Sequence, residues 1–467
     1  MQIVIEMFEE LKGVGEAGQT MIRQVDATWR STGGGRAVEY AAIEQQLATG
    51  AAAIERASHQ AVLQGLDIDQ PQVVIEGQRY TRVGRYEADY YPLAGSVRVT
   101  RTLYREQGQR NAKTVNAVSL RSGVVGEGWL PGTAQAMAHQ LQQGTSREAE
   151  TTARLLGRLP YARSSFASVG QEVGRQYTAV RTDLEAVLIE EYRVPAEAAS
   201  VSVALDRVSV PMEEAVAAQD RAAPPRARQR KVWRQFRMAY CATLTLHDRK
   251  GEALQTLRYG RMPQGEVAEL CQTLAQDVQT LLRKQPGLGV ILLADGAPEL
   301  WKLLTGSLNA ATLGVPVRQL VDLWHLLEKL GSAARLLYGE TQGSAVLHNW
   351  RLRLLNRTGS VAEILQELSN SGKREVAVGT SRPVHEAITY LENHQPRMNY
   401  AAARRHGLPV GSGNVEATCK SLVAVRMKRP GARWKEETGE HLLNLRALAL
   451  SDRWEPAMTL TLRPLRK

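Results

Sequence analysis

A chain of 467 residues is too long for a single hydrophobic core and is expected to form about two to four domains. Its composition, 43% hydrophobic and 23% charged, is that of a folded globular protein and excludes a largely disordered chain. The 59 Lys and Arg residues outnumber the 48 Asp and Glu residues, which favours a polyanionic partner, nucleic acid first. A surface that is rich in arginine and binds nothing is the alternative.

The three cysteines, Cys241, Cys271 and Cys419, show no C-x-x-C spacing, so we expect neither a disulfide framework nor a zinc ribbon. The amino terminus carries acids in place of a basic leader, and no apolar run approaches the roughly 18 residues of a membrane span. These features predict a cytoplasmic protein without a membrane partner, associated with the nucleoid if it binds DNA.

The pattern of apolar and polar residues in the first part of the chain changes near residue 70. Residues 1–70 are predicted to be helical, because apolar residues such as Tyr40 and Ile43 recur at helical spacing. Residues 71–116 alternate β-branched and polar residues between glycines, which predicts a small antiparallel sheet. Its exposed Arg and Tyr side chains either contact DNA or simply face solvent.

Residues 117–195 return to a helical period and contain a candidate DNA-reading element. The segments Thr145–Pro160 and Ser164–Gly170 predict two short helices, with Ser146 and Ser164 as their caps. Two short helices joined by a few residues would form a helix-turn-helix. Such pairs are also common in helical proteins that do not bind DNA.

Residues 196–325 have the element order of a mixed α/β sheet. The run Val201–Val210 is typical of a central strand, and Asp206 in its middle is unusual because Asp is depleted in strands. A second buried-strand pattern, Gly289–Ala294, leads directly into Asp295. The other expected elements are strands at Phe236–Leu246, Ala253–Arg258 and Val317–Val321, and a helix at about residues 266–284.

Residues 326–399 contain no strand-like run and predict a helical insertion, with apolar faces at Arg351–Leu355, Val361–Leu368 and His385–Leu391. The insertion separates the sheet from residues 400–455, which complete the core. Residues 456–467 are expected to form a C-terminal tail.

Three widely separated acids have the character of a divalent-metal site. Asp206, Asp295 and Glu416, which follows the glycine-rich turn Gly411–Asn414, offer the hard oxygen ligands that Mg²⁺ prefers. Two such ions about 4 Å apart can stabilise both the attacking and the leaving oxygen of a phosphodiester. Each acid also has a structural alternative: Asp206 could bond a loop, Asp295 could cap the helix near Pro298, and Glu416 could pair with Lys420.

The residues around these acids resemble the DDE transposases of bacterial insertion sequences, most closely the ISKra family. The similarity covers roughly residues 200–455, where the motifs occur in the same order as in the family. The amino-terminal half matches only in its general pattern of helical and strand-like segments. The matching stretches are Ala204–Val208, Leu293–Trp301 (LADGAPELW), Val321–Leu330, Arg405–Ala417 (RHGLPVGSGNVEA), Arg426–Trp434 (RMKRPGARW) and Leu442–Arg446.

The resemblance implies an α/β fold with an RNase H-like mixed sheet core and a helical insertion, preceded by helical and small β regions. It implies that Asp206, Asp295 and Glu416 are both the catalytic residues and the ligands of two Mg²⁺ ions, for which Mn²⁺ can substitute. The expected partners are double-stranded DNA at the element's terminal inverted repeats, target DNA, and further copies of the chain in a homodimer or larger assembly. The alternatives are a catalytically inactive DNA-binding protein on the same scaffold and a structure-specific nuclease.

Asp322 and His325 match a second motif, an acid followed three residues later by His, which Mutator-like relatives carry beside the active site. We expect the pair to support the active site or to handle DNA, and we do not expect it to ligate metal. Because the helix N-terminus disfavours added positive charge, the position favours a neutral imidazole. Asp322 acting only as a helix cap is the simpler alternative.

Two basic clusters are expected to track DNA phosphates. Between residues 397 and 435, nine Lys or Arg residues surround a single acid, Glu416. A solvated surface is the alternative for both clusters. The predicted DNA-binding residues are Arg226, Arg228, Arg230, Lys231 and Arg234 in the first cluster, and Arg405, Lys420, Arg426, Lys428, Arg429, Arg433 and Trp434 in the second.

Three aromatic residues, Trp324, Trp434 and Tyr400, are candidates for stacking on exposed bases. Core packing is the preferred interpretation for Trp324.

Overall fold

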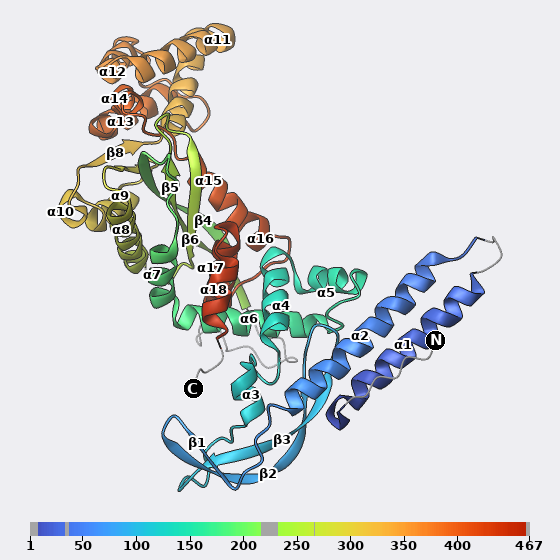
Figure 1. The fold of residues 1–467 in the computed structure, drawn as a ribbon. Coiled ribbons are helices and arrows are strands. Elements are labelled where there is room, and N and C mark those ends of the chain that lie inside the picture. The colour runs from blue at the N-terminus through green and yellow to red at the C-terminus, as the bar shows by residue number, and fades with distance from the viewer. Residues whose placement is uncertain (1–7, 33–36, 216–231, 266, 464–467) are drawn as a thin grey trace, which may run out of the picture. The chain divides into compact units, whose positions relative to one another are not determined.

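The computed structural model describes residues 8–32, 37–215, 232–265 and 267–463 of a chain that divides into two compact units. Unit 1 comprises Met1–Ala179 and Met458–Lys467, and unit 2 comprises Val180–Ala457. Figure 1 labels their helices and strands. No helix in the described part of the chain is long and apolar enough to cross a membrane.

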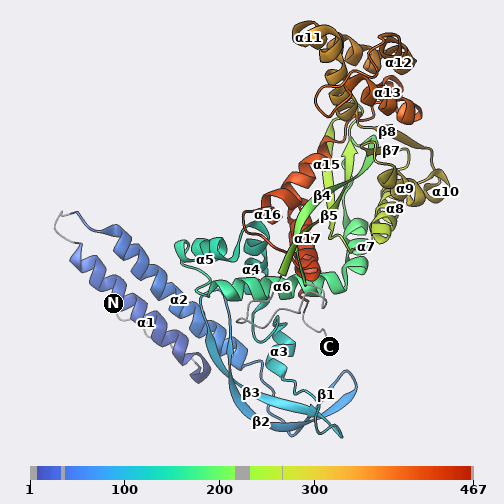
Figure 2. The ribbon, with the colours of Figure 1, turned by 180° about the vertical axis from the view of Figure 1, so that it is seen from behind.

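Unit 1 combines a helical hairpin, a three-stranded antiparallel sheet and a group of shorter helices, as the sequence predicts. Helices α1 and α2 lie side by side in both views (Figure 1, Figure 2), and the sheet has the order β1-β2-β3. Its elements are η1 (Glu9–Leu11), α1 (Lys12–Ser31), α2 (Tyr40–Gln64), β1 (Gln72–Ile75), β2 (Gln78–Tyr90), β3 (Val97–Glu106), α3 (Ala117–Ser122), α4 (Pro131–Gln143), α5 (Ser146–Leu155) and α6 (Arg163–Ala179).

The predicted caps of α5 and α6 are wrong by one or two residues. Thr145 is the N-cap of α5, because its hydroxyl accepts from the Glu148 N–H while the Glu148 carboxylate accepts from the Thr145 N–H. Ser146 is therefore the first residue of that helix, and Ser164 lies inside α6. Residues 156–162 join the two helices, a longer connection than the three or four residues of a helix-turn-helix.

Unit 2 is built on a five-stranded sheet with the order β6-β5-β4-β7-β8. Strands β4, β7 and β8 are parallel neighbours, and β5 runs antiparallel to both β4 and β6. This topology is the RNase H-like arrangement. Its elements are α7 (Arg181–Glu191), β4 (Ser200–Ala215), β5 (Val232–His247), β6 (Ala253–Arg261), α8 (Val267–Lys284), β7 (Gly289–Ala294), α9 (Pro298–Ser307), α10 (Ala310–Leu313), β8 (Val317–Val321), α11 (Leu323–Asn356), α12 (Ser360–Asn370), α13 (Pro383–His394), η3 (Gln395–Arg397), α14 (Tyr400–Arg405), α15 (Gly413–Thr418), η4 (Cys419–Ala424), α16 (Val425–Met427), α17 (Glu436–Leu450) and α18 (Trp454–Thr461), which crosses the boundary between the units.

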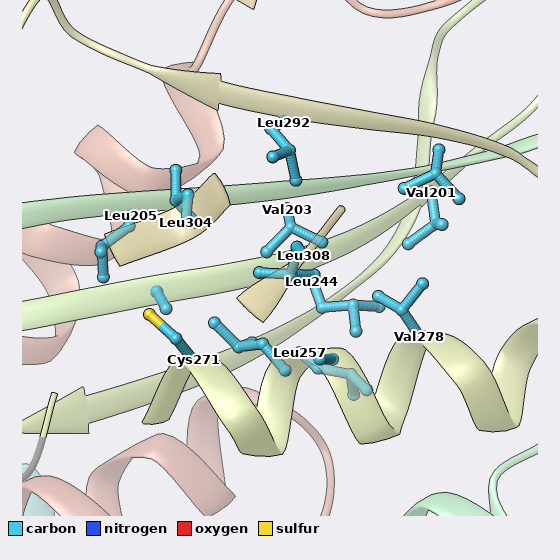
Figure 3. Packing of buried hydrophobic residues seen from close by; sticks show 14 of the residues in the cluster. Val201, Val203, Leu205, Leu244, Leu257, Cys271, Val278, Leu292, Leu304 and Leu308 are labelled. Atoms are coloured by element: carbon cyan, nitrogen blue, oxygen red, sulfur yellow. The ribbon is translucent and has the colours of Figure 1, made fainter. Parts of the chain in front are cut away.

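The main core of unit 2 lies between one face of this sheet and helices α8 and α9. Side chains alternate along a strand, so Val201, Val203 and Leu205 of β4 all point into this core. They meet the apolar stripe of α8, including Cys271 and Val278 (Figure 3). Asp206 is one residue out of phase with Leu205 and therefore belongs to the opposite face.

That opposite face is covered by the last part of the chain, since α15 and η4 pack on β4 and β5, and α17 packs on β6. Between β8 and α15 the chain forms helices α11–α14, which confirms the predicted helical stretch before Glu416. In both views α11, α12 and α13 gather at the β8 end of the sheet (Figure 1, Figure 2).

Candidate metal centre

Three aspartates lie in one row, just beyond the point where the pairing of the three parallel strands ends. The pairing of β4 with β7 ends at Ala204 beside Leu293, and the pairing of β7 with β8 sets Leu293 beside Leu320. Two residues further along each strand are Asp206, Asp295 and Asp322. Parallel neighbours lie about 4.8 Å apart, and residues in one row point to the same face. The register therefore brings together acids that are up to 116 positions apart in sequence.

Asp206 and Asp295 are both half-buried, and each uses one carboxylate oxygen in a local hydrogen bond. Oδ1 of Asp206 accepts from the Arg207 N–H at 2.7 Å, and Oδ1 of Asp295 accepts from the Ala297 N–H at 2.9 Å. The second bond shapes the turn that leads into α9, whose N-cap is Ala297. Asp295 therefore supports the start of this helix without being its cap.

Asp322 is fully buried and joins two elements that are far apart in sequence. Oδ1 accepts from the N–H groups of Trp324 and His325 at the start of α11, at 2.6 and 2.9 Å. Oδ2 accepts from the N–H of Ser412 and from its hydroxyl, the latter at 2.7 Å. Burial alone would raise the pKa of Asp322, but the bonds from His325 and Ser412 outweigh it and lower the pKa to about 2. Asp322 is thus a helix cap that also holds the turn before Glu416.

The turn before Glu416 is fixed against the start of α11. The Leu323 N–H donates to the Val410 carbonyl at 3.1 Å, beside the Asp322–Ser412 bonds. At Gly411, an added Cβ would lie 3.0 Å from the Trp324 ring, which explains why a residue without a side chain stands there. Ser412 is the N-cap of α15, so these contacts set where Glu416 emerges from the first turn.

His325 lies between two carboxylates. Its Nδ1 is 3.4 Å from Oδ1 of Asp322 and 3.6 Å from Oε1 of Glu416, which is half-exposed. The contact with Asp322, followed by the charge of Glu416, outweighs partial burial and raises the pKa of His325 to about 9. The predicted neutral imidazole is therefore wrong, because two nearby negative charges exceed the effect of the helix dipole.

The structure brings Asp322, His325 and Glu416 into one group whose potential ligand atoms all lie within 4.8 Å of one another. Asp322 is the least suited of the three to bind a cation, since both of its oxygens already accept two hydrogen bonds. Asp206 and Asp295 stand in the same row of the sheet but outside this group. Among the described residues, the carboxylates of Asp206, Asp295 and Glu416 do not form a group of ligand atoms that all lie within 4.8 Å of one another.

The sequence interpretation missed two residues of the insertion that cover the aspartate row. Tyr390 and His394 lie on α13, and a Cβ added at Gly296 would meet both side chains at 2.7 Å. Burial, followed by the charges of Asp295 and Asp322, raises the pKa of Tyr390. The feature of the sequence that could have indicated this contact is Gly296, a glycine directly after Asp295.

The aromatic candidates are placed differently from the sequence interpretation. Trp324 is half-exposed and does not pack in the core, because it stands at the start of α11 with the Arg351 guanidinium over its ring. Tyr400 is completely buried and cannot stack on a base. Trp434 is half-buried, and its indole N–H donates to the Met427 carbonyl at 3.0 Å.

The basic residues divide into exposed and buried members. Arg426 is buried with its guanidinium 5.1 Å from the Trp434 ring centre, so its predicted contact with phosphate is wrong for this conformation. Arg429 is half-buried. Arg226, Arg228, Arg230 and Lys231 lie outside the described residues, as does the side chain of Arg234. The exposed members of the second cluster are Arg405, Lys420, Lys428 and Arg433.

No family model and no curated protein sequence matches the chain. Among solved structures, it is similar to the Drosophila P element transposase strand transfer complex, with 13% sequence identity and a TM-score of 0.37. The similarity covers 70% of this chain and 92% of that chain.

Proposed function

We propose that the chain is a DNA transposase of the ISKra type, which cleaves and joins strands at the terminal inverted repeats of an insertion sequence. One observation carries the proposal. The continuous helical segment α15–η4 is tethered at Ser412 to Asp322 and at Cys419 to Asp206, and Glu416 lies between the two tethers. An acid held beside a row of aspartates offers the carboxylate ligands with which two divalent metal ions can act on a phosphodiester.

Asp206, Asp295 and Glu416 are the residues that would hold two Mg²⁺ ions. When bound, such ions polarise the phosphodiester and stabilise charge on the attacking and leaving oxygens. The protein's own contribution is to fix the three carboxylates on rigid elements, two on neighbouring strands and one on a helix. Asp322 and His325 are positioning residues in this scheme: Asp322 anchors the turn before α15, and His325 contacts the Glu416 carboxylate.

Several exposed cations favour DNA as the partner. Lys420 lies one turn after Glu416, and Lys428 and Arg433 follow after the end of α16. They are placed to neutralise phosphates of a strand that reaches the carboxylates. Assembly of two or more copies on paired DNA ends belongs to the same proposal.

The test is strand cleavage with end-labelled DNA that carries the inverted repeats found beside the gene, in Mg²⁺ or Mn²⁺. Asp295→Asn is expected to abolish cleavage and joining and to retain DNA binding, because it removes one metal ligand and no basic side chain. Asp183→Asn, at an exposed acid in the first turn of α7, is the matched control and should act like the unmodified protein.

Cleavage by Asp295→Asn in Mg²⁺ would contradict the assignment. Binding without cleavage by the unmodified chain would identify the inactive DNA-binding protein instead. Cleavage without joined products would identify a nuclease.

A further inference from the structure

Helix α1 of unit 1 carries a stripe of apolar side chains that remains exposed in the described part of the chain. None of the residues of this helix is buried, and Trp29 and Ile22 are 75% and 66% exposed. Helix α2 packs on a different face of α1 (Figure 1), where a Cβ added at Gly50 would lie 3.1 Å from Cγ of Met21. Single exposed apolar residues are ordinary, but a continuous stripe of them on one helix indicates a surface that binds a partner.

The stripe has the spacing of a seam between two paired helices. Its positions are separated alternately by four and three residues, which is a heptad pattern. A groove of about 490 Å³ lies along the stripe, and Ile54 of α2 contributes to its wall. The spacing and the groove together fit a further helix. The positions of the stripe are Leu11, Gly15, Gly18, Ile22, Val25 and Trp29.

Gly18 is not explained by packing within the chain. A glycine inside a helix costs about 1 kcal/mol relative to alanine. Apart from the backbone of its own helix, a Cβ added at Gly18 would meet no described atom within 4 Å, so nothing in the described chain requires the missing side chain. A glycine on the surface of a helix allows another backbone or side chain to approach closely. Gly18 is therefore suited to a contact with another molecule.

The stripe is complementary to a second copy of itself that runs in the opposite direction. With the two-fold axis near residue 20, Ile22 of one copy faces Gly18 of the other, and Val25 faces Gly15. Trp29 then lies against the first residue of the stripe in the other copy. Each large side chain in the centre is opposed by a glycine, and the two-fold axis repeats every contact, so all six positions take part.

The charges beside the stripe fit the same arrangement. Among the residues that flank this seam, the charged ones are Lys12 and Asp26, both on the same side of it. In the antiparallel register Lys12 of each copy faces Asp26 of the other, whereas a parallel pair would set both against uncharged residues. In the single chain they form exposed ion pairs with Glu9 at 3.7 Å and Arg30 at 3.0 Å, and such pairs contribute little.

The face is large enough for a stable dimer. A helix of 20 residues is about 30 Å long, and two helices packed side by side present a face about 20 Å wide. Pairing two such faces would bury about 600 Å² on each copy and about 1,200 Å² in all, the lower limit for specific and stable interfaces. We propose that this stripe is the interface of a homodimer in which the α1 helices of two copies pair antiparallel. The dimer forms without DNA, which goes beyond assembly on paired DNA ends.

The test is analytical ultracentrifugation of the full-length chain without DNA, over a range of concentrations. The unmodified chain should sediment as a dimer. Gly18→Ala should weaken association by about tenfold or more, because the new methyl group lies where Ile22 of the other copy packs. Gly13→Ala is the matched control: Gly13 lies on the opposite side of α1, an added Cβ there meets nothing within 4 Å, and the gain in helix propensity is the same. It should leave association unchanged.

Reversal of the flanking charges tests the antiparallel register. Lys12→Asp and Asp26→Lys should each weaken association by about threefold or more, because like charges then face each other twice in the dimer. The chain with both changes should associate within about twofold of the unmodified chain. Circular dichroism checks that the helices of each variant still form, and the exposure of both positions makes them independent of the core.

A chain that stays monomeric, a Gly18→Ala chain that associates like the unmodified one, or a double charge reversal that restores nothing would overturn the proposal. A monomer that instead sediments with anionic phospholipid vesicles would identify a lipid surface as the occupant of the stripe.

This proposal and the proposed function fail separately. A dimer that depends on Gly18 in a chain that never cleaves DNA would leave the interface intact and refute the transposase. Cleavage by a chain that is monomeric without DNA would do the reverse.

Discussion

Replacing Asp322 by Asn tests whether this buried carboxylate holds the turn before Glu416. The carboxylate accepts four hydrogen bonds, two from α11 and two from Ser412. An amide of the same shape offers one oxygen and one NH₂, so two of the donors would face another donor. Hydrogen bonds to a charged group contribute about 1.5–3 kcal/mol each, and the loss of two predicts a destabilisation of about 3–6 kcal/mol.

The measurement is urea unfolding followed by circular dichroism, with Asp183→Asn as the control, which should change stability by less than about 0.5 kcal/mol. Ser412→Ala should lie between the two at about 1–2 kcal/mol, because it removes only the hydroxyl bond to Oδ2. At temperatures where Asp322→Asn remains folded, DNA cleavage should still fall, because Glu416 loses its anchor. A cost below about 1 kcal/mol for Asp322→Asn would refute the anchoring role.

Two further predictions concern stability. Burial raises the pKa of Asp277, which accepts from the Tyr259 hydroxyl, to about 7, so between about pH 4 and pH 7 the folded chain holds one more proton than the unfolded chain. The free energy of unfolding should therefore fall by up to about 4 kcal/mol as the pH rises through this window. Thermal unfolding should show this fall for the unmodified chain and not for Asp277→Asn. The same dependence of stability on pH in both proteins would contradict the prediction. Gly407→Ala should cost at least about 2 kcal/mol in urea unfolding, because φ is 64° and the new Cβ would lie 2.0 Å from the Arg249 carbonyl oxygen. Gly372→Ala, at φ 65° with open space around it, is the matched control, and equal costs for the two would show that the contact with Arg249 does not matter.

The five-stranded sheet was predictable because its signals are local. Alternating apolar residues along Val201–Leu205 identify a strand with a buried face, and the charged residue that follows interrupts a pattern in which charge is rare. Asp295 stands at the end of an unbroken apolar run for the same reason. The helical stretch before Glu416 was visible from the absence of any strand pattern over more than seventy residues.

The details of the site depend on contacts that local patterns do not contain. Asp322 looks like an ordinary cap until Ser412, 90 positions later, is seen to share its carboxylate. The charge of His325 follows from two acids that approach it from different elements. The thiol of Cys419 reaches Asp206, with Sγ 3.5 Å from Oδ2, from the first residue of η4, which is a π-helix. No periodicity in the sequence predicts this π-helix.

The bond between Leu323 and Val410 has a consequence for how this architecture can vary. It closes the segment of residues 324–409 at its base, so the two points where the chain leaves and re-enters the sheet region of unit 2 are neighbours. The entropy of closing a loop grows only with the logarithm of its length, so a segment of this size costs about 2 kcal/mol more to close than one of ten residues. Lengthening or shortening the segment would therefore change the surface that surrounds the carboxylates while barely altering the free energy of assembling them.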